Sequence, residues 1–311
     1  MKVFRSFESA AAADLRALAL GFFDGVHRGH RQIIASAIRD DATVSGVLTL
    51  EPHPQAVLCP DQAPPLLTGL PHKLRDFAAL GVKNAVVLPF DQQTALTTAA
   101  GFLRQLGGAL PNLRRVAVGP NWRFGHHRAG GVALLRQWCA ERGIALTAGE
   151  FVRQDGQPVS SSRIRALVAD GELAAAAALL GQPYSLFGTV VTGHQLGRRL
   201  GFPTVNLATL DQCLPPRGVY FGAVIISDEP AARPAAINIG TRPSLGDAAS
   251  AVVIEAHLLD FQRDLYGATV SVRPQKFWRP EQTFPSLAAL QEQLHRDTAA
   301  AQAFHCQRHG F

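Results

Sequence analysis

Two histidines three residues apart lie in a glycine-rich segment, residues 21–30, that reads GFFDGVHRGH and follows an apolar run. In a first helical turn, His27 and His30 share one face, and a neutral imidazole still offers one N–H. Gly29 leaves room for a phosphate to approach the N–H groups at the helix start. Such a pair can stabilise charge on a departing pyrophosphate, which predicts transfer at the α-phosphate of a nucleotide. A bare pair would more simply be capping or surface histidines; the preceding strand and the glycines favour the phosphate site.

Residues 160–165, SSSRIR, offer a second set of phosphate-binding groups. Hydroxyls ahead of a helix suit the tail of a triphosphate, and Arg163 and Arg165 can each hold a phosphate with two N–H groups. Taken alone, the segment is better explained by a serine N-cap followed by solvated arginines. It becomes informative only in company with the two histidines.

A second glycine-rich segment, residues 193–206, reads GHQLGRRLGFPTVN. Its three glycines, with Arg198 between two of them, could fold over a polyphosphate, although hairpin turns use the same residues. Thr204 and Asn206 stand two apart, so a strand would place both on one side as hard oxygen ligands for Mg²⁺. The segment predicts transfer at the γ-phosphate, and both segments together predict an enzyme that uses ATP twice.

Glu255 is an acidic residue in the otherwise apolar run 251–256. A carboxylate there needs a partner or a purpose, and it is suited to act as a general base towards an alcohol. An equally good interpretation is that Glu255 and His257, two apart, share the polar face of a strand.

The first half of the chain alternates short apolar runs with amphipathic stretches. We expect the strands 17–20, 44–50, 85–88, 116–118 and 144–147, and the helices 30–39, 72–80, 99–106 and 132–141. Repeated strand–helix units predict a doubly wound, Rossmann-like parallel sheet, in which ligands bind at the carboxyl ends of the strands. The histidines follow the first strand and therefore fall at that edge.

The pattern changes after an alanine-rich helix, 172–180, which a Gly-Gln-Pro break ends. We expect the strands 186–191, 219–226, 235–239, 252–259 and 269–272, followed by a helix from 287 to about 304. Strands without intervening helices indicate a small antiparallel sandwich or barrel. The predicted domains are residues 1–183 and 184–311.

Composition limits the function classes. The 311 residues are 47% hydrophobic and 17% charged, which indicates folded domains, and the net charge of +6 is spread thinly. We therefore expect small anionic substrates and no nucleic acid as partner. Four scattered cysteines, with no signal peptide and no membrane span, predict a cytoplasmic protein, either a monomer or a weak homo-oligomer. His305, Cys306 and His309 could ligate a metal, but a frayed terminal helix is the better interpretation.

The first half resembles the HxGH nucleotidyltransferases, and more closely the adenylyltransferase module of bacterial bifunctional riboflavin kinase/FAD synthetases. The supporting segments are 21–30, 51–54, 119–125 and 160–165. The resemblance implies that ATP and FMN are joined to FAD with release of pyrophosphate, with His27 and His30 as catalytic residues. The implied ATP-binding residues are Gly21, Phe23, Asp24, Gly25, Gly29, Ser161, Arg163 and Arg165. The implied flavin-binding residues are Asn121, Trp122 and Phe124, where many relatives have Asp for Asn121 and Phe for Trp122.

The second half resembles the riboflavin kinase module of the same enzymes, a small antiparallel β-barrel. The segments 193–206, 218–220, 238–244, 255–261 and 264–267 carry that resemblance, and Leu245 departs from the family pattern. It implies Mg²⁺-dependent phosphorylation of riboflavin to FMN, with Thr204 and Asn206 at the metal and Glu255 as the base. The implied ATP-binding residues are Gly193, Gly197, Arg198, Gly201 and Pro203.

Two other functions are compatible with the same motifs if one or both halves of the chain bind ligand without catalysing a reaction. A monofunctional FMN adenylyltransferase would keep a barrel that only binds flavin, although intact Thr204, Asn206 and Glu255 count against it. A flavin- or nucleic-acid-binding regulator would bind ligand without forming product, and the even spread of basic residues gives it little support.

Overall fold

The computed structural model describes residues 1–193, 196–208, 211–229, 231–241 and 252–309. The chain divides into two compact units, Met1–Ser161 and Ser162–Phe311. This division falls after the first residue of α8 (Ser161–Ala169), so that α9 (Leu173–Leu180) lies in the second unit. The domain boundary at residue 183 stays a prediction.

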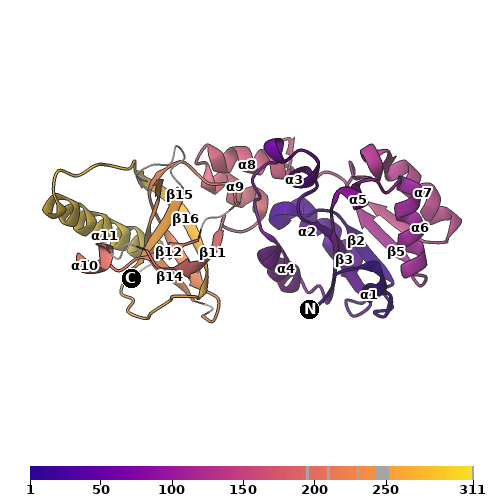
Figure 1. Cartoon of the computed structure of the whole chain (residues 1–311), viewed down its shortest axis with the longest axis horizontal. Coiled ribbons are helices and arrows are strands. Elements are labelled where there is room, and N and C mark those ends of the chain that lie inside the picture. Colours follow the sequence, from indigo (N-terminus) through magenta and orange to yellow (C-terminus); the bar gives the residue numbers. More distant parts are fainter. Residues whose placement is uncertain (194–195, 209–210, 230, 242–251, 310–311) are drawn as a thin grey trace. The chain divides into compact units, whose positions relative to one another are not determined.

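The first unit is built on a parallel sheet of six strands in the order β1-β4-β3-β2-β5-β8 (Figure 1). Every neighbouring pair in it is parallel, as the strand–helix alternation predicts. The strands are β1 (Lys2–Phe4), β2 (Ala17–Leu20), β3 (Ser45–Glu51), β4 (Asn84–Pro89), β5 (Arg115–Val118) and β8 (Ala145–Ala148). The helices are α1 (Phe7–Ala11), α2 (Arg28–Ile38), α3 (Pro54–Leu58), α4 (Leu70–Ala79), α5 (Gln92–Ala95), α6 (Ala99–Ala109) and α7 (Val132–Glu141).

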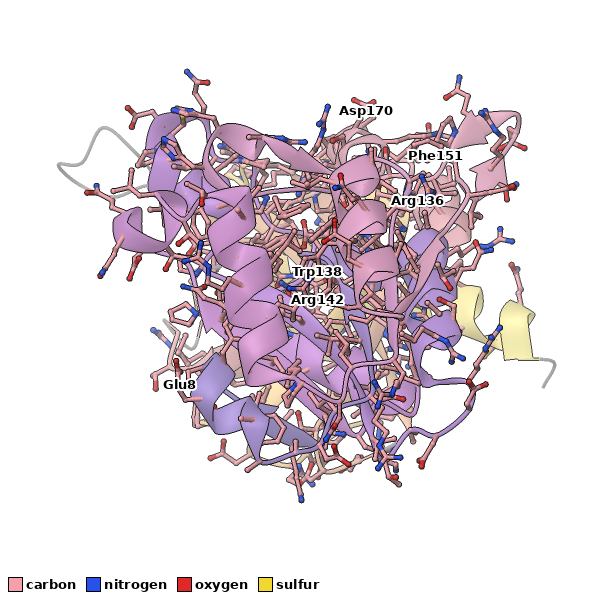
Figure 2. The ribbon with its side chains drawn as sticks, turned by 90° about the vertical axis from the view of Figure 1, so that its right-hand side faces the viewer. Glu8, Arg136, Trp138, Arg142, Phe151 and Asp170 are labelled. Carbon is pink, nitrogen blue, oxygen red and sulfur yellow. The ribbon has the colours of Figure 1, made fainter. Side chains whose placement is uncertain are left out.

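Helices cover both faces of this sheet because its central strands are apolar on both sides. Leu18 and Leu20 of β2 join a core with α6 and α7, whereas Ala19 between them joins a core with α2 and α4. At the end of α7, Arg142 lies over the ring of buried Trp138, 4.9 Å from its centroid (Figure 2). The doubly wound architecture is confirmed.

The second unit contains a closed antiparallel barrel in the order β11-β12-β15-β14-β13-β16. Along β15, the buried residues Ile254, Ala256 and Leu258 alternate with half-buried Glu255 and His257, so the barrel interior is apolar. The strands are β11 (Leu186–Val191), β12 (Val205–Leu207), β13 (Gly218–Ile226), β14 (Ala232–Thr241), β15 (Val252–Leu258) and β16 (Thr269–Arg279). The sequence predicted either a sandwich or a barrel, and the structure shows a closed barrel.

Helix α11 (Leu287–His309) packs on the outside of this barrel (Figure 1). Its Ala301 joins a small apolar cluster with Phe221 of β13, and Asp297 is buried against the end of β16. The Asp297 carboxylate accepts from Trp278 Nε1 at 3.1 Å and from Arg279 Nη2 at 2.6 Å. Among the described residues, no helix has the length and apolar character that crossing a bilayer requires.

Candidate active sites

The first candidate site lies where the strand order of the parallel sheet reverses. Strand β2 pairs with β3 on one side and with β5 on the other. The chain runs from β2 through β3 to β4 on one side and then crosses to β5 on the other. Ligands of doubly wound sheets bind at the carboxyl ends of the strands beside such a point. Gly21 directly follows β2, and Gly119 directly follows β5.

The turn after β2 has an unusual backbone. Phe23, Gly25 and Val26 have φ values of 57°, 79° and 41°, in the left-handed region. For a β-branched residue such as Val26, this conformation is a genuine outlier, and it is held by complete burial of its side chain. Strain of this kind is concentrated at functional sites, where surrounding packing compensates for it.

Two glycines of the segment make room for aromatic rings. A Cβ on Gly21 would lie 2.8 Å from the Phe23 ring, and one on Gly29 would lie 3.2 Å from Cε1 of His27. Gly29, which the sequence predicts to leave space for a phosphate, therefore stands directly beside the ring of His27. Its contribution to ATP binding stays a prediction.

The structure brings His27 and His30 together at the first turn of α2. Their rings stack with centroids 3.5 Å apart and planes inclined by 17°. His27 is the N-cap residue, and its Nδ1 accepts from the backbone N–H of His30 at 3.3 Å. In neutral His27 the ring proton is therefore on Nε2, so that this atom donates.

Burial keeps both imidazoles in the neutral form. It lowers the pKa of His27 to about 4. It also holds the pKa of His30 well below 6.5, and the charges of His27 and Lys73 act in the same direction. Near neutral pH the pair is thus a set of neutral donors beside a helix N-terminus, which suits stabilisation of phosphate charge.

Asp24 and Ser161 fix the turn in place. The Asp24 carboxylate is buried and accepts from the backbone N–H of Leu67 at 3.0 Å and from that of Thr68 at 3.0 Å. Its backbone carbonyl accepts from the Ser161 hydroxyl at 2.9 Å. Three distant segments of the first unit are therefore tied together by one residue of the turn.

The remaining predicted residues of the first half lie in two other places. Asn121 is exposed in the loop after β5, whereas Phe124 is buried and stacks on Trp122 with centroids 4.5 Å apart. Arg163 and Arg165 are half-buried in α8 and belong to the second compact unit. The flavin role of the aromatic pair and the phosphate role of the arginines stay predictions.

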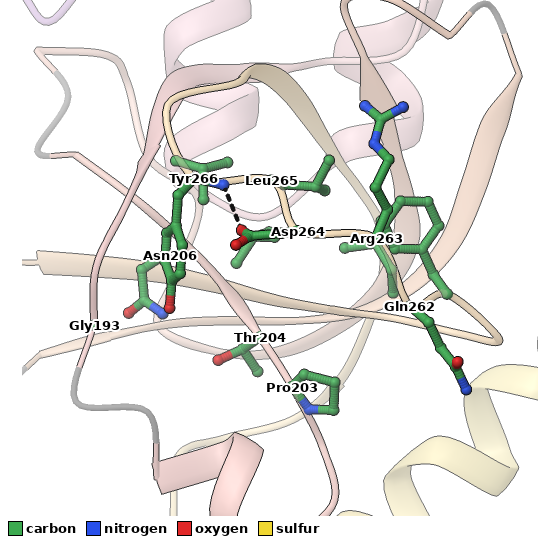
Figure 3. Close-up of a pocket in the computed structure, with 13 residues that line it drawn as sticks. Gly193, Pro203, Thr204, Asn206, Gln262, Arg263, Asp264, Leu265 and Tyr266 are labelled. Atoms are coloured by element: carbon green, nitrogen blue, oxygen red, sulfur yellow. Dashed lines mark hydrogen bonds between the residues drawn. The ribbon is translucent and has the colours of Figure 1, made fainter.

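The second candidate site is a pocket of about 290 Å³ in the barrel unit (Figure 3). Thr204 and Asn206, predicted to share one side of a strand, both line it, as do Gly193 and Pro203. The opposite wall is the loop after β15, where Asp264 accepts from the backbone N–H of Tyr266 at 3.0 Å. The residues lining it are Val190, Gly193, Pro203, Thr204, Val205, Asn206, Leu258, Phe261, Gln262, Arg263, Asp264, Leu265 and Tyr266.

Three positions beside this pocket require glycine, two because a side chain would be too close to neighbouring atoms and one because its backbone has a positive φ. A Cβ on Gly193 would lie 2.6 Å from the Asn206 carboxamide, and one on Gly197 would overlap the carbonyl oxygen of Phe202. Gly201 has a φ of 90°, which disfavours any side chain. Arg198 lies in the short helix α10 (Leu196–Arg199). Its side chain falls outside the described part of the structure.

Glu255 lies opposite Asn206 in the β12–β15 ladder. Directly opposed residues point to the same face of a sheet with their Cβ atoms about 5 Å apart, so a carboxylate stands beside the carboxamide. Both interpretations of Glu255 made from the sequence fit this geometry, because His257 is on the same face and its Nδ1 donates to the carbonyl oxygen of Pro203 at 2.8 Å. Glu255 is not among the residues that line the pocket itself.

The oxygen ligands of this pocket fit Mg²⁺. Thr204 and Asn206 supply a hydroxyl and a carboxamide, and Mg²⁺ is usually held by few protein ligands together with waters and substrate phosphates. No group of three His, Cys, Asp or Glu side chains that could hold a metal occurs within the described ranges.

Sequence reasoning gave no individual role to the wall formed by Arg263, Asp264 and Tyr266. In the sequence, this wall was indicated only by the short segment 264–267, one of those that carry the resemblance to the riboflavin kinase module. Leu245, the departure from the family pattern, lies outside the described residues. The terminal helix extends to His309 rather than ending near 304, and His305 is buried.

A parallel α/β unit with a strained turn at its switch point, followed by an antiparallel barrel with a pocket lined by polar side chains, fits a two-domain nucleotide-dependent transferase. The FAD synthetase family model matches residues 10–163, and the riboflavin kinase family model matches residues 180–305. The chain belongs to the family of bifunctional riboflavin kinase/FMN adenylyltransferases. Both activities follow from its two modules, and the monofunctional alternative is not supported.

The family assignment extends over almost the whole chain. A bifunctional riboflavin kinase/FMN adenylyltransferase of Escherichia coli strain K12 is 37% identical over 98% of both chains. The protein of that description from Pseudomonas fluorescens is 34% identical over 91% of both. A crystal structure described as a macrolide-efflux protein from Streptococcus pneumoniae has a TM-score of 0.80, at 26% identity and with 97% of this chain covered.

Proposed function

We propose that the turn containing His27 and His30 performs adenylyl transfer and that the pocket containing Thr204 and Asn206 performs riboflavin phosphorylation. The observation that carries the proposal is the stacked pair of neutral histidines at the start of α2, at the switch point of the sheet. Its counterpart in the barrel is the juxtaposition of Glu255 and Asn206.

In the adenylyl step, a phosphate oxygen of FMN attacks the α-phosphorus of ATP. The bond from that phosphorus to the bridging oxygen breaks, and pyrophosphate leaves with its electron pair. Because the nucleophile is already an anion, no side chain has to accept a proton. His27 and His30 donate from Nε2 to phosphate oxygens, and Asp24 and Ser161 hold the turn that presents them.

In the kinase step, Glu255 accepts the proton of the ribityl hydroxyl, whose oxygen attacks the γ-phosphorus of ATP while the bond to the β–γ bridging oxygen breaks. ADP is the leaving group. Thr204 and Asn206 would hold Mg²⁺, which when bound neutralises charge on the phosphates. The packing of Gly193 against Asn206 fixes the position of the carboxamide.

A chromatographic time course with riboflavin, ATP and Mg²⁺ tests this division of labour. Wild-type protein should form FMN first and FAD afterwards. His27→Ala should accumulate FMN and form FAD about 100-fold more slowly, the loss typical of one removed transition-state donor. Glu255→Ala should lose FMN formation yet still convert supplied FMN to FAD. A kinase rate that survives Glu255→Ala would show that Glu255 is not the base.

We also propose that the protein is cytoplasmic, acts on small molecules without a nucleic-acid partner, and is a monomer or weak homo-oligomer. Support comes from its four free cysteines and its thinly spread charge. Analytical ultracentrifugation over a range of protein concentrations, with and without added oligonucleotide, tests the last two points.

A further inference from the structure

His257 is a polar residue of β15 that takes no part in the proposed kinase step. It shares the outer face of the barrel with Glu255 and is half-buried there. Its Nδ1 lies 2.8 Å from the carbonyl oxygen of Pro203. Because a carbonyl oxygen can only accept, Nδ1 carries the proton and donates it. The imidazole therefore joins β15 to the residue that immediately precedes Thr204.

This hydrogen bond lies where the paired part of β12 begins. The β12–β15 ladder pairs Asn206 with Glu255 and Val205 with Ala256, and continuing its register by one residue brings His257 beside Thr204. The carbonyl of Pro203 belongs to the same planar peptide unit as the Cα of Thr204. Fixing that carbonyl therefore fixes the Cα atom from which the Thr204 hydroxyl projects.

The residues before Pro203 are held from the same outer side of the barrel. The buried Phe202 ring meets the His257 ring edge-to-face with centroids 5.5 Å apart, and it meets His295 of α11 edge-to-face at 4.8 Å. Gln291 of the same helix donates from Nε2 to the carbonyl oxygen of Leu200 at 3.3 Å. The end of the glycine-rich segment is therefore braced by both β15 and α11.

These braces act on the pocket from outside it. Pro203, Thr204 and Asn206 lie along one wall of the pocket, whereas neither His257 nor His295 lines it (Figure 3). An influence of His257 on the pocket therefore has to pass through the backbone that it holds. Residues that orient the ligands of a metal commonly lie in this way, one contact away from the ion.

We propose that His257 is a positioning residue for riboflavin phosphorylation, whose Nδ1–H fixes the peptide unit before Thr204 and so directs the Thr204 hydroxyl towards Mg²⁺. This role deepens the proposed role of Thr204 and rests on it, and it requires no contact between His257 and substrate. Glu255 keeps its proposed role as the base. The two polar residues of this face then have different tasks, and His257 serves the metal side of the pocket.

Substitution at position 257 can test this role because the donor can be kept or removed with little change in size. The side-chain nitrogen of asparagine is bonded to Cγ, as is Nδ1 of histidine, whereas that of glutamine is one bond further out. His257→Asn should therefore keep the hydrogen bond to Pro203, and His257→Gln and His257→Leu should lose it. Arg296→Leu, which removes an exposed charge beside His295, is the control.

The methyl resonance of Thr204, in protein labelled with ¹³C at threonine methyl groups, reports on this site alone. Mn²⁺ added with ADP should broaden it in the wild type. His257→Leu and His257→Gln should require about 10-fold more Mn²⁺ for equal broadening, the loss typical of removing a residue that orients a metal ligand. The Mg²⁺ concentration that gives half-maximal kinase rate should rise in parallel, whereas the KM for riboflavin and FAD formation from supplied FMN should not change. His257→Asn and Arg296→Leu should match wild type.

Two results would overturn the role of His257. One is an unchanged Mn²⁺ requirement in both His257→Leu and His257→Gln, and the other is an equal loss in His257→Asn and His257→Gln. If His257→Leu does not fold, the comparison of the two amide variants carries the test by itself. Absence of broadening at Thr204 in wild-type protein would contradict the proposed function of Thr204 itself, and the role of His257 with it.

Discussion

At the scale of single residues, the two sites obtain their geometry in different ways. The turn that contains His27 and His30 depends on buried, neutral groups in a strained backbone, in which Phe23 and Val26 are the non-glycine residues with positive φ. The pocket lined by Thr204 and Asn206 depends on the missing side chain of Gly193, which lets Asn206 pack against the backbone. A change of one methyl group should therefore affect the second site sharply.

Gly193→Ala tests this dependence. The new Cβ would lie 2.6 Å from the Asn206 carboxamide, so Asn206 has to move, and we expect kinase kcat/KM to fall about 10- to 100-fold. FAD formation from supplied FMN should be unaffected. Gly108→Ala, where a Cβ meets nothing within 4 Å, is the control and should change neither rate. Normal kinase activity in Gly193→Ala would show that the position of Asn206 is not critical.

Residue types and spacing predicted which residues lie close together in each candidate site better than they predicted the contacts of those residues. The stacking of His27 on His30 follows from their spacing. The hydrogen bonds from the backbone N–H groups of Leu67 and Thr68 to Asp24 could not be predicted in this way, because these residues are far apart in sequence and are brought together by the fold. The burial of Lys73 could not be predicted from the sequence either, because one lysine in an amphipathic helix is normally solvated.

At the scale of elements, a buried charged cluster around Asp297 holds α11 to the barrel together with the apolar cluster around Ala301. Asp297 is 3% exposed and binds Arg279 and Trp278 of β16 as well as Gln293 one turn earlier. Removing one partner of such a cluster leaves the other charge buried without compensation. This end of the barrel should therefore be sensitive to one substitution.

Asp297→Ala should lower the free energy of unfolding of the second unit by about 3 to 5 kcal/mol. Urea denaturation followed by the fluorescence of Trp278, in a Trp122→Phe/Trp138→Phe background, would measure it. Glu292→Ala, which breaks only the exposed pair with Arg296, should cost less than about 1 kcal/mol. Equal effects of the two substitutions would argue against a special role for the buried cluster.

Periodicity predicted the long elements and missed the short ones. The observed bounds of β2 and α7 coincide with the predicted ranges, because apolar runs of the right length end at glycine or at a charged residue. Strand β1 has three residues and an exposed pattern, so nothing in its sequence distinguishes it from a terminus. Strand β16 continues to Arg279 because pairing with β13, a long-range contact, extends it beyond its apolar part.

At the scale of the whole molecule, the chain combines two compact units with separate cores and separate chemistry. His27, His30 and His72 are all in the first unit, and burial is the first cause that lowers the pKa of each. The proposed role of His27 and His30 and the pH stability of this unit are therefore linked through the same groups.

The sign of that linkage predicts acid sensitivity of the first unit. Above pH 6.5 these histidines are neutral in both the folded and the unfolded chain, so their contribution to stability is complete. As the pH falls from 6.5, these histidines become protonated in the unfolded chain. In the folded chain they stay neutral until the pH reaches the lowered pKa, which is about 4 for His27 and about 3 for His72. The loss from His27 alone can reach about 3 kcal/mol.

Hydrogen exchange of first-unit amides between pH 7 and 4.5, after correction for intrinsic exchange rates, measures this loss. His27→Gln should flatten the dependence of stability on pH, whereas His127→Gln, at an exposed position, should leave it unchanged. Because the proposed function uses the neutral form of both histidines, FAD formation should persist from pH 8 to pH 6 and decline only where the first unit begins to unfold. A decline centred at pH 6.5 in a fully folded protein would mean that His27 titrates at its ordinary pKa, and that burial does not keep the pair neutral.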